Sequence, residues 1–276
     1  MSCTPLVDLA TIAENYGQMT GVLAGFAFAA LVLILAPGSG STRTPSWSAG
    51  ASLTLLSALI ALIVTTLLYS LLAGEDMEAA RARAATVELI DGLAFGLAVV
   101  ALFQGVAVLM RRAGVDPVAA RAARVAGVVV FPALAMYFVA QGAADTEAMR
   151  AAFRGEPCVA AIPPLGAGLT VALGLVLAVS LTSRVQAVMA AYAERCRVWA
   201  PILVILASGV AALVAGDLGT RSPTLLLSPR ALDVFLAVSA LLLGAVGLMF
   251  SASGATAPDA DIIEDFPKEP AIPRRR

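Results

Sequence analysis

Seven long apolar segments dominate this sequence, and no charged side chain lies near the middle of any of them. A helix needs about 20 apolar residues to cross a hydrocarbon core about 30 Å thick. Lipid offers no hydrogen-bond partners to the backbone, so each segment must form a helix. The sequence therefore predicts an all-α integral membrane protein, a seven-transmembrane-helix bundle with spans at residues 19–36, 50–73, 90–110, 123–141, 162–182, 198–216 and 231–251.

The composition supports this class and excludes several activities. Hydrophobic residues make up 60% of the 276 residues and charged residues only 13%, against about 25% charged in soluble domains. The chain has no histidine, which removes His-bound zinc, imidazole-ligated haem and Ser-His-Asp hydrolysis. Its only lysine, Lys268, lies beyond the last span, so no Schiff base can form inside the bundle. We expect no enzyme activity, no catalytic residue, no metal and no cofactor, and no basic block that would bind nucleic acid.

Two less apolar segments flank the predicted membrane domain, 19–251. Residues 1–18 contain no Lys or Arg, unlike the start of a signal peptide, and predict an external N-terminal helix leading into the first span. Residues 252–276 mix Pro, Asp and Glu with few large apolar side chains. Such a segment buries too little surface to offset its ordering entropy, so we expect a disordered cytoplasmic tail.

Basic residues predict the orientation, because Lys and Arg are retained on the cytoplasmic side of a membrane. An N-out, C-in arrangement in the plasma membrane places twice as many of them inside as outside. The inside set is Arg43, Arg111, Arg112, Arg121, Arg124, Arg184, Arg195, Arg197, Lys268, Arg274, Arg275 and Arg276. The fourth span is the weakest because Pro132 interrupts it. Its loss would invert everything that follows, so the charge distribution also favours seven spans.

A weak internal repeat relates the first three spans to the last three. When the sequence is aligned with itself at a shift of 142 residues, Asp91 matches Asp233 and Gly105 matches Gly247. The offset moves the chain by four spans, so both halves keep the same orientation. The sequence thus predicts a parallel 3+1+3 repeat with the fourth span as connector, an arrangement found in transporters that bind substrate between their halves.

Polar side chains near the outer ends of the spans form a candidate outer polar site: Glu14, Gln18, Asp91, Asp217 and Asp233. Carboxylates close to lipid are costly unless they are paired or hydrated, so they tend to line cavities. Together these residues predict an acid-lined outer vestibule that attracts cations or moves protons. Structural explanations stay open as well, because an acid near a helix start complements the helix dipole and Asp217 could pair with Arg221 or Arg230.

Two hypotheses for function follow. The first is a small-solute or cation/proton permease or channel, with the acidic vestibule between two three-helix halves. The second is a non-transporting membrane scaffold or regulatory subunit, which would meet a protein partner at the cytoplasmic arginine loops or the tail. A homo-oligomer in the lipid bilayer is compatible with either. A cavity lined by acids favours the permease, whereas acids on separate outer faces favour the scaffold.

The cysteines predict one disulfide. In this topology Cys3 and Cys158 face the oxidising side and Cys196 faces the reducing cytoplasm. We expect a Cys3–Cys158 disulfide, the alternative being two free thiols. Its signature is a change in gel mobility of the purified chain on reduction, which a Cys158→Ser variant lacks. Identical mobility of both proteins with and without reductant would contradict the disulfide.

Overall fold

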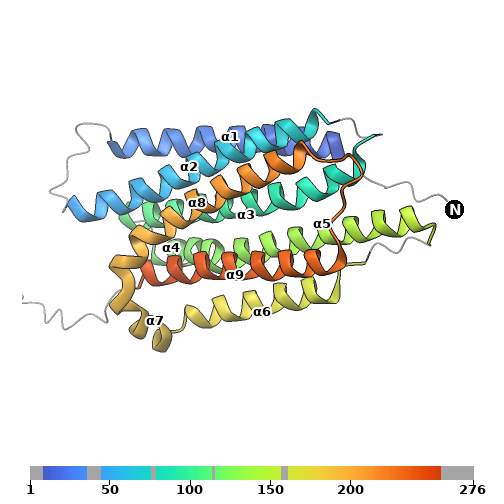
Figure 1. Ribbon diagram of the computed structural model, residues 1–276. Helices are drawn as coiled ribbons and strands as arrows, with labels where there is room; N and C mark the ends of the chain where they lie inside the picture. Colours follow the sequence, from blue (N-terminus) through green and yellow to red (C-terminus); the bar gives the residue numbers. More distant parts are fainter. Residues whose placement is uncertain (1–8, 36–44, 76–78, 114–115, 157–160, 256–276) are drawn as a thin grey trace, which may run out of the picture.

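The computed structural model describes residues 9–35, 45–75, 79–113, 116–156 and 161–255. Within them the chain is helical, and no strand is present. Cys3 and Cys158 and most of the predicted tail lie outside the described residues. The helices are α1 (Leu9–Leu35), α2 (Pro45–Ala73), α3 (Arg81–Arg112), α4 (Pro117–Val125), α5 (Phe131–Arg154), α6 (Pro164–Ser180), α7 (Ser183–Met189), α8 (Ala193–Gly219) and α9 (Pro229–Ser253) (Figure 1). A π-helical turn, Ala126–Val130, joins α4 to α5, and a 3-10 turn, Ala190–Tyr192, joins α7 to α8.

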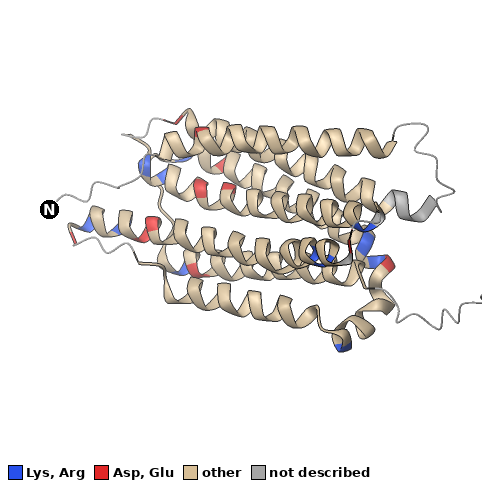
Figure 2. Ribbon diagram, turned by 180° about the vertical axis from the view of Figure 1, so that it is seen from behind, with Lys and Arg blue, Asp and Glu red and all other residues tan. Residues whose placement is uncertain are grey.

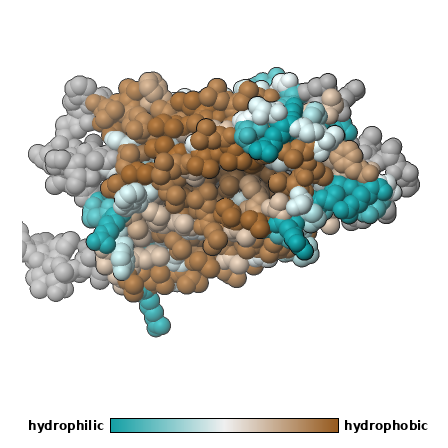
Figure 3. Space-filling model, in the orientation of Figure 1, coloured by the Kyte–Doolittle hydropathy of each residue, from teal (hydrophilic) through white to brown (hydrophobic). Residues whose placement is uncertain are grey.

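Six helical segments are long and apolar enough to cross a membrane: Leu9–Leu35, Gly50–Ala73, Arg81–Arg111, Val118–Arg154, Ser183–Gly219 and Pro229–Ser253. The apolar helix α6 is shorter, at 17 residues. Apolar side chains cover most of the visible face between the two ends of the bundle (Figure 3), and charged residues gather toward these ends (Figure 2). The all-α prediction is therefore confirmed, and the apolar helices indicate a membrane protein.

Local sequence explains where several helices begin and end. Asp116 caps α4, because its side chain accepts hydrogen bonds from the backbone N–H groups of Val118 and Ala119. Ser228 caps α9 in the same way, and a proline follows it at the first helical position. Gly155 ends α5 with φ of 69°, a left-handed conformation that glycine adopts without steric cost.

The π-helical turn lies directly before Pro132, the residue that weakens the fourth predicted span. A proline inside a helix lacks the N–H group for one backbone hydrogen bond, and its ring crowds the carbonyl four residues earlier. Here the N–H of Phe131 donates to the oxygen of Ala126, five residues back. The wider turn takes up one extra residue at this point. The helical path therefore continues from α4 through Pro132 to the end of α5.

α3 occupies the centre of the bundle and packs against α2, α5 and α8. α1 covers α2 at one edge, whereas α6 packs against α5 and α9 at the other edge (Figure 1). One large buried cluster takes side chains from all seven apolar helices, and a smaller one joins α1, α2, α3 and α8. We call the two ends of the bundle the Asp217 end, where α8 ends and α3 and α9 begin, and the Arg197 end, where α8 begins and α3 and α9 end.

The two predicted halves pack differently. In a 3+1+3 repeat α1 would correspond to α6 and α2 to α8, yet α6 packs on α5 and α9 instead of packing on α8 as α1 does on α2. A leucine side chain packs against each of the two matched glycines: Leu55 of α2 against Gly105, and Leu177 of α6 against Gly247. These two leucines come from helices that do not correspond in the repeat. The two halves therefore resemble each other in sequence pattern, but their helices make different contacts.

Close approach of α3 to α5 predicts opposite effects for two neighbouring glycines. A Cβ at Gly96 would lie 2.5 Å from the Cβ of Ala135, whereas a Cβ at Gly92 would meet no atom within 4 Å. Overpacking costs about 1–3 kcal/mol, and glycine in a helix interior costs about 1 kcal/mol relative to alanine. We expect Gly96→Ala to lower the melting temperature of the purified protein and Gly92→Ala to leave it unchanged or raise it. Equal shifts in the two variants would contradict this packing.

Candidate functional site

Four of the five predicted site residues are exposed, on three different helices. Glu14 and Gln18 lie on α1, where Nε2 of Gln18 donates to Oε1 of Glu14 at 3.4 Å. Asp217 lies near the end of α8 and forms an ion pair with Arg221, Nη2 to Oδ2 at 2.7 Å. Asp233 lies on α9, exposed. The structure therefore does not bring these four side chains into one site.

Asp91 is the fifth predicted residue, and it is fully buried. One helical turn to either side of it, Val87 and Ala94 belong to the smaller apolar cluster, together with Tyr69 of α2 and Ala211 of α8. Neither carboxylate oxygen of Asp91 has a hydrogen-bond partner. A carboxyl group in such surroundings is stable only with a proton on it or a cation beside it.

A pocket of about 420 Å³ opens along the adjacent face of α3, toward α1 and α5. Each of these helices contributes one face, since the lining residues recur at steps of three and four. α1 supplies Ile12, Tyr16, Met19 and Leu23; α3 supplies Glu88, Leu89, Gly92, Phe95, Gly96, Val99 and Phe103; α5 supplies Phe131, Leu134, Ala135, Phe138, Val139, Gln141, Gly142 and Asp145. Tyr69 of α2 completes the lining. We call this the α1–α3–α5 pocket.

Aromatic rings form much of its wall. Tyr16 stacks on Tyr69 with ring centroids 5.3 Å apart, and Phe95 meets Tyr16 edge to face at 5.4 Å. Toward the Arg197 end, Phe103 and Phe131 stack at 3.8 Å. Glu88 and Phe103 are separated by about 22 Å along α3, at about 1.5 Å per residue. The pocket is therefore long, with its carboxyl groups near one end and a pair of phenyl rings at the other.

Two carboxyl groups, Glu88 and Asp145, line the pocket, and none of its lining residues is basic. Glu88 is half-buried, and its Oε2 is buried without a hydrogen-bond partner. Asp145 is exposed. Both lie two to three helical turns inside their helix ends, at residues 81 and 154. The pocket therefore combines apolar walls with net negative charge at the end nearer the Asp217 end.

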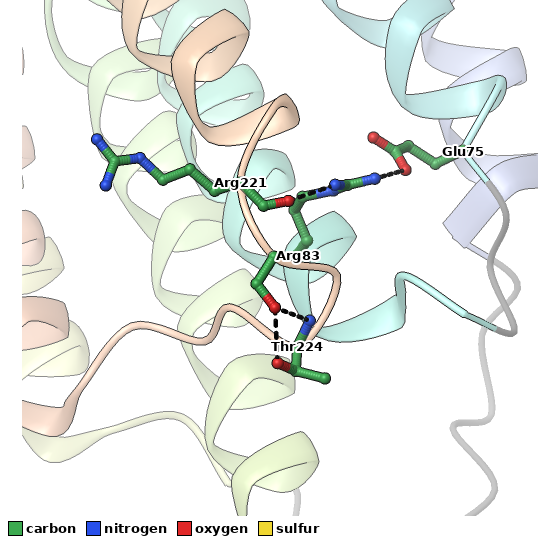
Figure 4. Close-up of polar contacts among 5 residues, drawn as sticks. Glu75, Arg83, Arg221 and Thr224 are labelled. Carbon is green, nitrogen blue, oxygen red and sulfur yellow. Dashed lines mark hydrogen bonds and ion pairs between the residues drawn. The ribbon is translucent and has the colours of Figure 1, made fainter.

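Three arginines at the Asp217 end pair with acids outside the pocket. Arg83 binds Glu75, Nη2 to Oε2 at 2.6 Å, and also donates to the backbone oxygen of Arg221 (Figure 4). Arg150 pairs with Glu147, and Arg221 pairs with Asp217. In the described part of the chain no ion pair reaches the acids in and beside the pocket, Glu88, Asp91 and Asp145.

Glu88 and Asp145 were not among the residues predicted from the sequence. Hydropathy begins the third span at residue 90 and ends the fourth at 141, which leaves both acids outside the predicted spans. The helices extend farther, with α3 starting at Arg81 and α5 ending at Arg154. A signal was present, because Leu134, Phe138, Gln141 and Asp145 follow the spacing of one helical face.

Among the described residues, no group of three or more Cys, Asp or Glu side chains is arranged to hold a metal ion. Comparison with protein families, curated proteins and solved structures finds no match to this chain. The pocket and its two carboxyl groups are therefore the features that indicate a function.

Proposed function

We propose that this chain is a permease for small organic cations that carry an apolar group, and that the α1–α3–α5 pocket is its binding site. One observation carries the proposal: two carboxyl groups line an aromatic pocket that has no basic lining residue. The proposal includes seven crossings of the plasma membrane, with the N-terminus outside and the C-terminus inside. The pocket then opens toward the outer half of the membrane.

The chemistry of the lining favours an organic cation over a metal ion. A small inorganic cation needs several oxygen ligands in place of its hydration shell. An alkylammonium ion needs fewer oxygen ligands, because aromatic ring faces attract its charge. Burial of its apolar part against the pocket walls stabilises the complex further. Tyr16, Tyr69 and Phe95 supply the rings near Glu88. The pocket's length suits a molecule with its charge at one end.

Asp91 supports coupling to protons. It lies three residues from Glu88 on α3, so the two side chains are neighbours on the helix surface. A cation held at Glu88 would stabilise the ionised form of Asp91, and a proton would leave when the cation arrives. Release of the cation would return the proton. One carboxyl group would thus exchange a proton for each bound cation.

Transport can be measured with purified protein in liposomes. The probe is the phenylbutyl-trimethylammonium ion, and the control is its uncharged isostere with a quaternary carbon in place of nitrogen. With an acidic interior, we expect faster uptake of the ion than in protein-free liposomes, and slower uptake once the pH gradient is collapsed. Uptake equal to that of protein-free liposomes would contradict the permease.

A second candidate is the non-transporting scaffold or regulatory subunit. It is favoured by the exposure of Glu14, Asp217 and Asp233 on three separate helices, without a shared acidic mouth. Purification from native membranes discriminates between the two. A scaffold should copurify with a partner at fixed stoichiometry and should leave cation flux unchanged.

The number of crossings has a direct test. The six longer helices alone would leave both termini on one side, whereas the additional crossing by α6 places them on opposite sides. We expect reporters fused to the two termini to respond on different sides of the membrane, the C-terminal one in the cytoplasm. Both reporters on the same side would remove α6 from the spans and overturn the orientation.

A further inference from the structure

A second cavity, of about 260 Å³, lies toward the Arg197 end of the bundle, on a different face of α3 from the α1–α3–α5 pocket. It is bounded by the first turns of α2 and α8 and by the last turns of α3 and α9. Its polar lining residues include Arg111, Arg197, Thr54 and Gln104, and no carboxylate lines it. Its charge is thus opposite to that of the first pocket.

Arginine side chains gather around this cavity. Arg197 pairs with Glu194, Nη1 to Oε1 at 2.8 Å. Arg111 reaches the backbone oxygen of Gly254 only at 3.5 Å. A Cβ at Gly254 would lie 3.0 Å from Nη1 of Arg111 and 3.3 Å from Nε of Arg124, so these two guanidinium groups converge on the end of α9. The buried Nε of Arg124 has no hydrogen-bond partner.

Gln104 also lines the cavity. It is 1% exposed, and its Nε2 donates to the backbone oxygen of Phe250 at 3.4 Å. Its buried Oε1 lies on the side of Gly127, where a Cβ would be 3.4 Å away, and Gly127 does not line the cavity. The two lining arginines therefore determine the chemistry of a ligand, which should carry negative charge.

We infer that this cavity binds a phosphate group, from either a phospholipid headgroup or a free phosphate. Guanidinium groups match phosphate oxygens with two parallel hydrogen bonds, which chloride cannot reproduce. Basic pockets between membrane helices are suited to anionic headgroups. The inference does not depend on cation transport.

The test measures thermal unfolding of the full chain in phosphatidylcholine nanodiscs. One arm adds inorganic phosphate against sodium chloride at equal ionic strength, and the other adds phosphatidylglycerol to the disc. We expect stabilisation in at least one arm. Stabilisation by phosphatidylglycerol alone identifies a headgroup site, and stabilisation by phosphate alone identifies a soluble ligand. Arg111→Gln and Arg197→Gln should weaken the apparent affinity about tenfold or more, the equivalent of about 1.4 kcal/mol.

Arg184→Gln is the matched control, because Arg184 is an exposed arginine at the same end of the bundle. It should keep the wild-type response. If Arg111→Gln does not fold, Arg197→Gln and Arg197→Lys test the site alone. The lysine variant should retain part of the affinity, because it keeps the positive charge but lacks the planar guanidinium that makes two parallel hydrogen bonds. No stabilisation of the wild type beyond chloride in either arm would overturn the site. An equal loss in Arg184→Gln and Arg197→Gln would overturn it as well.

Discussion

A Glu88→Gln, Asp145→Asn double variant should bind the phenylbutyl-trimethylammonium ion no better than its uncharged isostere. Both substitutions remove charge and preserve side-chain shape, so the apolar pocket and its aromatic wall remain. A trimethylammonium group has no N–H donor, so each carboxylate attracts it by charge alone, which contributes about 1 kcal/mol or more for each pair. We therefore expect the affinity for the cation to fall by about tenfold to a hundredfold, measured by equilibrium dialysis of purified protein.

Asp233→Asn is the control for this experiment, since Asp233 is an exposed acid on α9 that does not line the pocket. Its affinity for the cation should equal that of the wild type. The isostere should bind the wild type and the double variant equally, because it makes apolar contacts only. A double variant that keeps the wild-type preference for the charged molecule would exclude Glu88 and Asp145 as the cation site.

The second large effect concerns proton exchange at Asp91. In weakly buffered solution, addition of the cation to wild-type protein should release about one proton for each cation bound, because a nearby positive charge favours the ionised carboxyl group. Asp91→Asn has no proton to exchange there, so its release should fall to the level of the protein-free control. A pH electrode or a soluble indicator dye follows the release directly.

Stability separates this functional role from a structural one. Asp91 makes no hydrogen bond through its carboxylate oxygens and is fully buried, so Asp91→Asn removes no partner. We expect the variant to melt at the wild-type temperature or above while it loses proton release. A sharp fall in melting temperature would show that the Asp91 carboxyl group stabilises the folded protein. Unchanged proton release in a stable variant would show that another group carries the proton.

Apolar runs of about 20 residues were enough to predict the fold class and the approximate place of each apolar helix, because lipid forces such segments to be helical. Helix ends were harder to predict. α1 includes Leu9, which falls within the N-terminal helix predicted over residues 1–18, but α3 begins at Arg81, well before residue 90, where hydropathy starts the third span. Polar first turns look like loops in an average over many residues, although capping and packing keep them helical.

The site was predicted only in part. Asp91 was among the predicted residues, yet nothing in its neighbourhood in the sequence distinguishes it from Asp233, which has the same place in the repeat. Burial separates them, and burial depends on which helices pack together. Glu88 and Asp145 belong to helices separated by a connecting segment, and their shared pocket is a tertiary feature. Periodicity alone shows which residues share one face of a helix, but it does not show which other helix packs against that face.

Equilibrium binding of the charged probe and its isostere to wild-type protein tests the central claim most directly. If the α1–α3–α5 pocket holds a cation, the phenylbutyl-trimethylammonium ion should bind at least about ten times more tightly than the isostere. Competition between the two should show that they share one site. Equal affinities, or tighter binding of the uncharged molecule, would contradict a cation site at Glu88 and Asp145 and leave an apolar groove without charge selectivity.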